Sequence, residues 1–185
     1  MKFIKTELEG VIICEPQIFA DERGYFCETF RLDLLEDFCR QKFDFVQDNE
    51  SLSNAGVLRG LHFQLPPHAQ TKLVRVVRGR VLDVAVDIRK NSATFGKFVA
   101  VELSGENKRQ MLLPKGFAHG FLVLENDTIF SYKVDSYYNK ECDRGILWND
   151  AQIGINWGDF YDLDKLILSQ KDLIAPKLSE IKELF

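Results

Sequence analysis

The residues best suited to chemistry lie in one stretch, Arg59 to Lys72, which carries two of the three histidines with an arginine and a lysine. Short apolar runs on either side predict β-strands, and Pro66-Pro67 marks a loop because proline cannot donate to a sheet ladder. His62 and Lys72 stand equally far from Pro67. If the stretch is a hairpin of regular register, these two side chains face each other on one surface.

A neutral imidazole opposite an ammonium is suited to abstracting a proton and holding the anion that results. The alternative interpretation of His62 and Lys72 is a pair of solvated residues at the ends of two strands. The stretch by itself leaves both interpretations open.

The elements that position this stretch belong to a chain of 185 residues, for which one domain spanning residues 1–185 is the default expectation. A net charge of −4 argues against a nucleic-acid partner, and no apolar run is long enough to cross a bilayer or to serve as a signal peptide. The four cysteines have neither metal-type spacing nor the density of a disulfide scaffold. We therefore expect a cytoplasmic protein with reduced cysteines.

Short runs rich in Phe and β-branched residues alternate with Gly, Pro, Asn and Asp, which predicts an all-β sandwich or barrel. The predicted strands are Val11–Cys14, Tyr25–Phe30, Leu73–Val77, Val81–Ile88, Phe98–Leu103, Met111–Leu113, Phe121–Leu124 and Ile129–Val134. Apolar spacing predicts a helix over Leu32–Cys39, and Pro176 at a helix start predicts another over 176–184.

Five further polar features admit a functional and a structural interpretation. Arg23 in a turn can meet a phosphate or be solvated, and the amides of Gln47-Asp48-Asn49 can recognise a base edge or form a turn. His119 and Tyr132 lie in apolar surroundings, where packing with one hydrogen bond is the ordinary role. Asp172 can cap the final helix.

A catalytic metal is not expected. Metal sites of β-barrels of the cupin type take two ligands from His-x-His on one strand face, but here the stretch reads His62-Phe63-Gln64. An amide oxygen is a poor substitute for imidazole toward borderline metals. The sequence also lacks a Gly-rich phosphate loop and a dinucleotide fingerprint, so no cofactor is expected.

Taken together, these segments resemble the dTDP-4-dehydrorhamnose 3,5-epimerase family. The matching blocks, in family order over nearly the whole chain, are Asp21–Phe26, Phe45–Asn49, Val57–Gln64, Lys72–Arg75, Asp83–Arg89, Pro114–Gly120, Ile146–Asp150 and Ser169–Asp172. The resemblance implies a cupin-like jelly-roll β-barrel with a few short peripheral helices and no metal. It also implies a homodimer, in which the strand around Val11 to Phe19 is the expected edge-covering element.

The resemblance also assigns residue roles. His62 resembles the catalytic base, Asp172 its orienting partner and Tyr132 the general acid, while Lys72 is similar to the cation beside the carbon-4 ketone. The substrate-binding residues that the family implies are Arg23, Phe26, Glu28, Gln47, Asn49, Arg59, His119 and Tyr138. Phe26 suits stacking on thymine, Arg23 suits a pyrophosphate, and His119 supports the sugar or the phosphates.

The implied reaction converts dTDP-4-keto-6-deoxy-D-glucose into dTDP-4-keto-L-rhamnose, in the dTDP-L-rhamnose pathway of polysaccharide biosynthesis. A ketone acidifies the protons on both neighbouring carbons, so inversion needs a base, an enolate stabiliser and an acid on the far face. Three alternatives stay open: an epimerase acting at carbon 3 or 5 only on a related nucleotide sugar, a sugar-binding jelly roll without catalysis, and a metal-dependent cupin enzyme.

Overall fold

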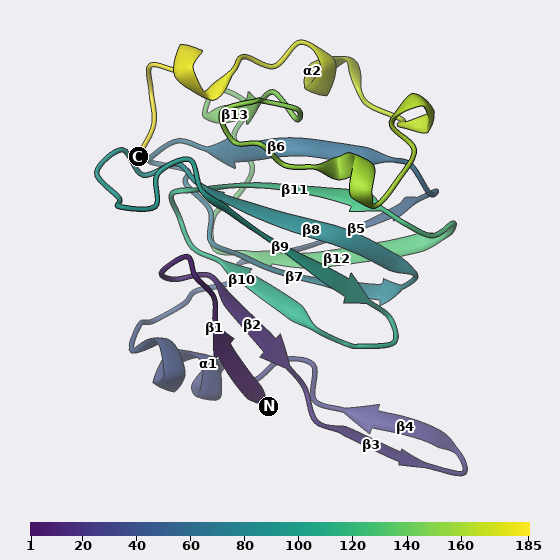
Figure 1. Ribbon diagram of the computed structural model, residues 1–185. Coiled ribbons are helices and arrows are strands. Elements are labelled where there is room, and N and C mark those ends of the chain that lie inside the picture. Colours follow the sequence, from purple (N-terminus) through teal and green to yellow (C-terminus); the bar gives the residue numbers. More distant parts are fainter.

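The computed structural model describes residues 1–185, which form mainly antiparallel β-strands (Figure 1). The strands are β1 (Lys2–Lys5), β2 (Ile12–Glu15), β3 (Ile18–Asp21), β4 (Gly24–Cys27), β5 (Gln47–Ser53), β6 (Leu58–Gln64), β7 (Lys72–Arg78), β8 (Arg80–Asp87), β9 (Phe98–Ser104), β10 (Gln110–Leu113), β11 (Phe117–Val123), β12 (Thr128–Val134) and β13 (Asp143–Ile146). The helical elements are α1 (Leu32–Cys39), α2 (Gln170–Leu173) and the 3-10 turns η1 (Trp157–Asp159), η2 (Leu163–Lys165) and η3 (Leu178–Glu180). None of these helices is both long and apolar enough to span a membrane.

Two antiparallel sheets form the body of the molecule. Six strands pair in the order β1-β2-β10-β7-β12-β5, and five pair in the order β13-β6-β11-β8-β9. The sheets remain separate rather than closing into one continuous ladder, and apolar side chains of both fill the space between them. The all-β fold class predicted from the strand pattern is confirmed.

The core between the sheets includes one pair of aromatic rings from opposite sheets. Phe121 of β11 stacks on Phe130 of β12, with ring centroids 4.0 Å apart and planes inclined by 11°. Both rings are almost completely buried. This stack is a rigid spacer between the two sheets, because aromatic rings cannot be compressed and each has few rotamers.

The outer faces of both sheets are covered as well. The segment 147–185 lies over the five-stranded sheet (Figure 1), with Trp157 and Leu178 in a cluster with Leu61 and Phe63. Helix α1 covers part of the six-stranded sheet with Leu35. Because both faces are buried, strands such as β8 are apolar at successive positions rather than at every second one.

Strands β3 and β4 pair only with each other and form an arm (Ile18–Cys27) that projects from the body (Figure 1). Its large side chains are exposed, Phe26 at 65%. Within the predicted edge-covering segment Val11–Phe19, β2 instead lies inside the six-stranded sheet, between β1 and β10. Only the end of that segment, Ile18 and Phe19, belongs to the arm.

Two expectations from the sequence are corrected. The helix predicted over 32–39 forms, but the one predicted over 176–184 is only the short turn η3. Its apolar residues pack along the five-stranded sheet in an otherwise extended chain. The hairpin of His62 and Lys72 is also wrong, because β6 and β7 lie in different sheets and the Pro66-Pro67 loop connects the two.

Leu122 of β11 is fully buried in the cluster beneath segment 147–185, so Leu122→Ala should lower the free energy of unfolding by about 2–5 kcal/mol. Leu52→Ala removes the same atoms from a side chain that is 63% exposed, and its effect should stay within about 0.5 kcal/mol. Urea unfolding of both variants checks the difference. Equal destabilisation would contradict the burial of β11 described here.

Candidate active site

A cavity of about 590 Å³ lies between the two sheets, and the stretch 167–172 contributes one wall. Its polar lining comes from both sheets and includes Asn49, Arg59, His62, Lys72, His119, Tyr132 and Asp172. Seven of the twelve residues proposed from the sequence therefore meet around one space. They come from strands β5, β6, β7, β11 and β12 and from helix α2.

His62 is anchored by a buried carboxylate. Its Nε2 lies 2.7 Å from Oδ1 of Asp172, a residue only 4% exposed. Burial alone would raise the pKa of Asp172, but hydrogen bonds from His62, Ser169 and the Gly60 amide together lower it. An ionised carboxylate can only accept, so His62 donates through Nε2–H and Nδ1 carries the free lone pair.

Local sequence explains why Asp172 fits against β6. Ser169 is the N-cap of α2, and its hydroxyl donates to Oδ2 of Asp172 over 2.7 Å. Gly60 donates its amide to Oδ1 over 3.2 Å. A Cβ at Gly60 would lie 2.5 Å from that oxygen, so a glycine is required for the carboxylate to approach the strand.

Lys72, at the start of β7, supplies a positive charge, and its surroundings lower its pKa. Burial lowers the pKa of Lys72 to about 8, Asp143 and Asp83 oppose this shift, and Lys171 adds to it. Lys171 in turn donates a hydrogen bond to Asp143. The charges of two carboxylates and a second cation thus act on the ammonium, which loses its proton at a pH of about 8.

A second imidazole stands beside the first. His119 of β11 is the cross-strand partner of His62, and its Nε2 lies 3.0 and 3.1 Å from the two carboxylate oxygens of Asp83. Burial lowers the pKa of His119 despite the adjacent Asp83 carboxylate. A neutral His119 that donates through Nε2–H offers an acceptor at Nδ1, which suits a sugar hydroxyl better than a phosphate.

Tyr132 approaches the cavity from the other sheet. Burial raises the pKa of its hydroxyl, an effect that Arg59 opposes, so the phenol keeps its proton over the neutral range. Its cross-strand partner is Asn49, whose Oδ1 accepts a hydrogen bond from Gln47 over 2.7 Å. Gln47 therefore lies next to the cavity lining and orients the Asn49 amide.

The guanidinium of Arg59 is held at the cavity by two contacts. It donates to Oγ of Ser53 over 3.2 Å and lies 5.9 Å from the ring centroid of Phe121. Arg59 is otherwise exposed, which leaves most of its donors available to an anion.

Five residues proposed from the sequence do not line this cavity: Gln47, which lies beside Asn49, and also Arg23, Phe26, Glu28 and Tyr138. Arg23 and Phe26 are on the exposed arm, and Glu28 follows it. Arg23 pairs with Asp21, and Glu28 pairs with Arg31. Tyr138 is 60% exposed, and its hydroxyl donates to Asp143 over 3.3 Å, which connects it to the Lys171–Asp143 pair.

Gln64, the residue in place of a second histidine, has a structural role. Its amide nitrogen donates to the carbonyls of His68 and Tyr137 over 2.7 and 3.3 Å, and its oxygen accepts from the Asn139 amide. The side chain therefore ties two loops together, and its oxygen is already engaged. Metal independence stays a prediction that this arrangement supports.

Several residues that bond to residues of the site or shift the pKa of Lys72 were missed by the sequence analysis. Asp83 is a single carboxylate within the apolar run of β8, and a buried carboxylate without an obvious partner is a signal of a polar network. Ser169, three residues before Asp172, has the spacing of a helix cap, whereas Asp172 was considered for that role. Lys171 and Asp143 meet only in the folded chain, and no local pattern pairs them.

The arrangement provides three functions in one space. A histidine with a free ring nitrogen and a tyrosine that keeps its proton stand on strands of different sheets, and the ammonium of Lys72 lines the same cavity. Such a site can remove a proton from one face of a carbon atom, stabilise an oxyanion and return a proton to the other face.

Comparison with known proteins assigns the chain to a family. Residues 5–180 match the family model described as dTDP-4-dehydrorhamnose 3,5-epimerase. The enzyme of that name from Shigella flexneri is 54% identical over 177 residues, which are 96% of each chain.

Solved structures agree. The crystal structure of dTDP-4-dehydrorhamnose 3,5-epimerase from Elizabethkingia anophelis NUHP1 superposes with a TM-score of 0.94 at 49% identity and covers 99% of both chains. The structure of dTDP-6-deoxy-D-glucose-3,5-epimerase from Legionella pneumophila Philadelphia 1, in complex with dTDP-4-keto-L-rhamnose, gives a TM-score of 0.92 at 47% identity. It covers 98% of this chain and 94% of the other. With its cupin-like β fold and this shared sequence, the chain belongs to the dTDP-4-dehydrorhamnose 3,5-epimerase family.

Proposed function

We propose that this protein epimerises dTDP-4-keto-6-deoxy-D-glucose at carbons 3 and 5 and thereby forms dTDP-4-keto-L-rhamnose for the dTDP-L-rhamnose pathway. The observation that carries the proposal is the placement of His62 and Tyr132 on different sheets around one cavity that also contains Lys72. Family membership supports the substrate class, because the relatives carry this activity in their names.

The first half of the reaction is proton abstraction. Nδ1 of His62 takes a proton from the carbon next to the ketone, the electron pair of that C–H bond forms a C=C bond to carbon 4, and the π pair of the carbonyl moves to its oxygen. Asp172 stabilises the imidazolium that forms, as it accepts from Nε2–H. The Lys72 ammonium stabilises the enolate oxygen.

The second half returns a proton to the opposite face. The Tyr132 hydroxyl donates its proton to the carbon atom and the enolate collapses to the ketone, leaving a phenolate and an imidazolium that re-equilibrate with solvent. Because the ketone lies between carbons 3 and 5, the same groups serve both positions once the sugar ring presents each in turn. No redox step is involved.

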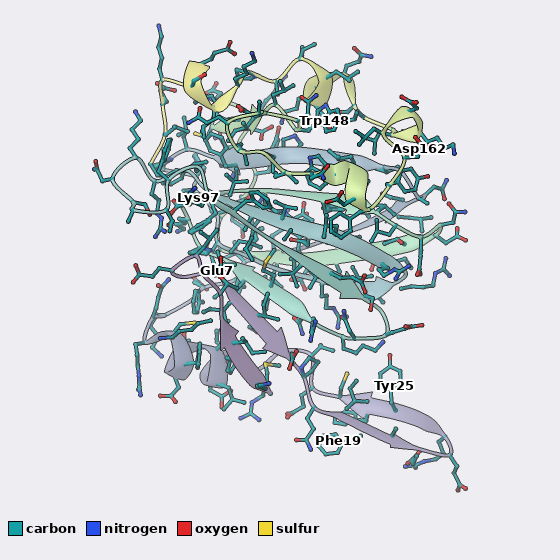
Figure 2. All side chains as sticks on the ribbon, in the orientation of Figure 1. Glu7, Phe19, Tyr25, Lys97, Trp148 and Asp162 are labelled. Atoms are coloured by element: carbon teal, nitrogen blue, oxygen red, sulfur yellow. The ribbon has the colours of Figure 1, made fainter.

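Nucleotide recognition divides into two groups of residues. Asn49 lines the cavity with Gln47 beside it, whereas Arg23 and Phe26 lie on the arm away from the body. Figure 2 shows Phe19 and Tyr25 on the same arm, where the Tyr25 ring contacts the body through Nζ of Lys108, 4.6 Å from the ring centroid. We infer a homodimer in which the arm of each protomer supplies Arg23 and Phe26 to the cavity of its partner.

One enzymatic alternative uses the same residues: epimerisation at carbon 3 or carbon 5 alone, on a related nucleotide-4-keto sugar. Proton NMR of the product formed in deuterated water decides this point by counting the carbons that carry deuterium.

A single domain spanning residues 1–185 and a cytoplasmic location remain predictions.

His62→Asn should abolish both deuterium incorporation from solvent and product formation, because no enolate forms without the base. Tyr132→Phe leaves the base and Lys72 in place, so exchange should continue while the epimerised product falls by about 10²–10⁴-fold. Proton NMR of the substrate in deuterated water measures both quantities. Full epimerisation by Tyr132→Phe would refute the role of the phenol.

The catalytic efficiency, kcat/KM, should fall as the pH rises above about 8, because Lys72, whose pKa burial lowers to about 8, then loses the proton that stabilises the enolate. Lys72→Arg keeps its charge at high pH, so the fall in kcat/KM should begin at a higher pH even though the maximum rate is lower. Rate profiles from pH 6 to pH 10 test this. An unchanged limb in Lys72→Arg would exclude Lys72 as its origin.

Complementation tests the shared site. At substrate concentrations well below KM, the His62→Asn protein should be inactive and the Arg23→Ala protein strongly impaired, because Arg23→Ala chiefly weakens substrate binding. Unfolding and refolding the two together creates heterodimers in which one site has both native residues. Random pairing of equal amounts should restore about one quarter of the wild-type activity. If Arg23 served the cavity of its own chain, every heterodimer site would carry one substitution and no activity would return.

A further inference from the structure

Asp172 is carried by a short span of chain, residues 169–175, between two anchor points on the five-stranded sheet. At the first anchor, the Ile167 amide donates to the Gly56 carbonyl over 2.8 Å. The Leu58 amide donates to the Ile167 carbonyl over 3.0 Å. This anchor is a strand-like contact made by the backbone alone.

The second anchor follows Asp172 in the chain and depends on a side chain. The Leu147 amide, just after β13, donates to the Pro176 carbonyl over 2.8 Å. Two residues farther along, the Leu178 amide donates to Oδ2 of Asp150 over 2.6 Å. Asp172 therefore lies four residues before Pro176, which Leu147 holds, and six residues before Leu178, which Asp150 holds.

Asp150 is buried, 5% exposed, and has no part in the proposed reaction. Its second oxygen, Oδ1, accepts from the Gln152 amide over 2.7 Å, so the carboxylate joins the turn at 150–152 to the turn η3 at 178–180. Both donors are backbone N–H groups rather than a cation. A carboxylate with two such donors makes charge-assisted bonds, which are stronger than bonds between neutral groups.

We propose that Asp150 is a positioning residue for the dyad: through Leu178 and Pro176 it fixes the span 169–175 and thereby the contact of Asp172 with His62. This effect on rate rests on the proposed function, whereas the effect on the dyad itself does not. The dyad is sensitive to such support, because a displacement of about 1 Å caused by a remote substitution can cost about 100-fold in rate.

The test uses Asp150→Asn, which preserves the size of the side chain but turns one acceptor into an NH₂ group facing an N–H donor. The control is Asp162→Asn, which makes the same chemical change in the same C-terminal segment. Asp162 is an exposed cap that accepts from the Asp164 amide. Figure 2 shows Asp162 and Trp148 in the layer that covers the five-stranded sheet.

The primary readout needs no substrate. With ¹⁵N-labelled histidine the protein gives signals from only three imidazoles, and their nitrogen shifts report the tautomer of each. Asp150→Asn should move His62 from a pure Nε2–H form to a mixture of tautomers. His119, which Asp83 holds within the sheet, should keep its signals and so exclude general loosening of the fold.

The kinetic readout should agree. Asp150→Asn should lower kcat by about 10- to 100-fold with little change in KM, because the contacts to the nucleotide are untouched. Asp162→Asn should leave both parameters and all imidazole signals unchanged. Unaltered His62 signals in folded Asp150→Asn would overturn the inference, and so would equal shifts of His62 and His119.

If Asp150→Asn does not fold, amide hydrogen exchange of the unmodified protein tests the same coupling. The Leu178 amide, bonded to Asp150, and the Gly60 amide, bonded to Asp172, should then open with the same free energy. Independent opening of the two would overturn the inference. An inactive wild-type enzyme would instead refute the proposed function. The imidazole signals and the hydrogen exchange would still test the role of Asp150, because neither needs a substrate.

Discussion

The contact of His62 Nε2 with Oδ1 of Asp172 is the interaction on which the arrangement of the site depends. A carboxylate that is almost fully buried is costly unless every oxygen finds donors, and here His62, Gly60 and Ser169 provide them. Each donor comes with a structural requirement: a histidine on β6, a residue without Cβ two positions earlier, and a capped helical turn packed above the strand. Loss of any one leaves the buried charge with one donor fewer.

Inversion at a carbon atom requires catalytic groups on its two opposite faces, and the two sheets of the sandwich can supply one group each. His62, the proposed base, lies on a strand of the five-stranded sheet, and Tyr132, the proposed acid, lies on a strand of the six-stranded sheet. In the proposed reaction, a substrate carbon between them loses a proton to one side and gains one from the other. Lys72 starts β7 in the second sheet, directly after the loop that leaves β6. The connection between the sheets thus brings the base and the cation together from nearby positions in the sequence.

Much of this could be predicted from the sequence, and the remainder could not for physical reasons. The strand pattern and the family blocks identified the fold, and all four residues proposed for catalysis line one cavity.

The predicted hairpin was wrong because the spacing around Pro66-Pro67 indicates a turn but does not say whether the turn joins neighbouring strands or two sheets. The strand β5 was missed because its sequence is polar, and burial alternates along it only in the folded molecule. The helix predicted over 176–184 was wrong because its apolar residues pack against the five-stranded sheet from an extended chain. Asp150 accepts a hydrogen bond from the Leu178 amide in that conformation.

The stacked rings of Phe121 and Phe130 set the spacing between the sheet that carries His62 and the sheet that carries Tyr132. That spacing is therefore a property of the hydrophobic core and not of a surface loop. On warming, the gap between His62 and Tyr132 can widen only when the core itself opens. The separation of His62 and Tyr132 should therefore be lost together with the cooperative melting of the fold. Thermal inactivation and global unfolding would then share one midpoint, without an earlier phase in which the two walls drift apart.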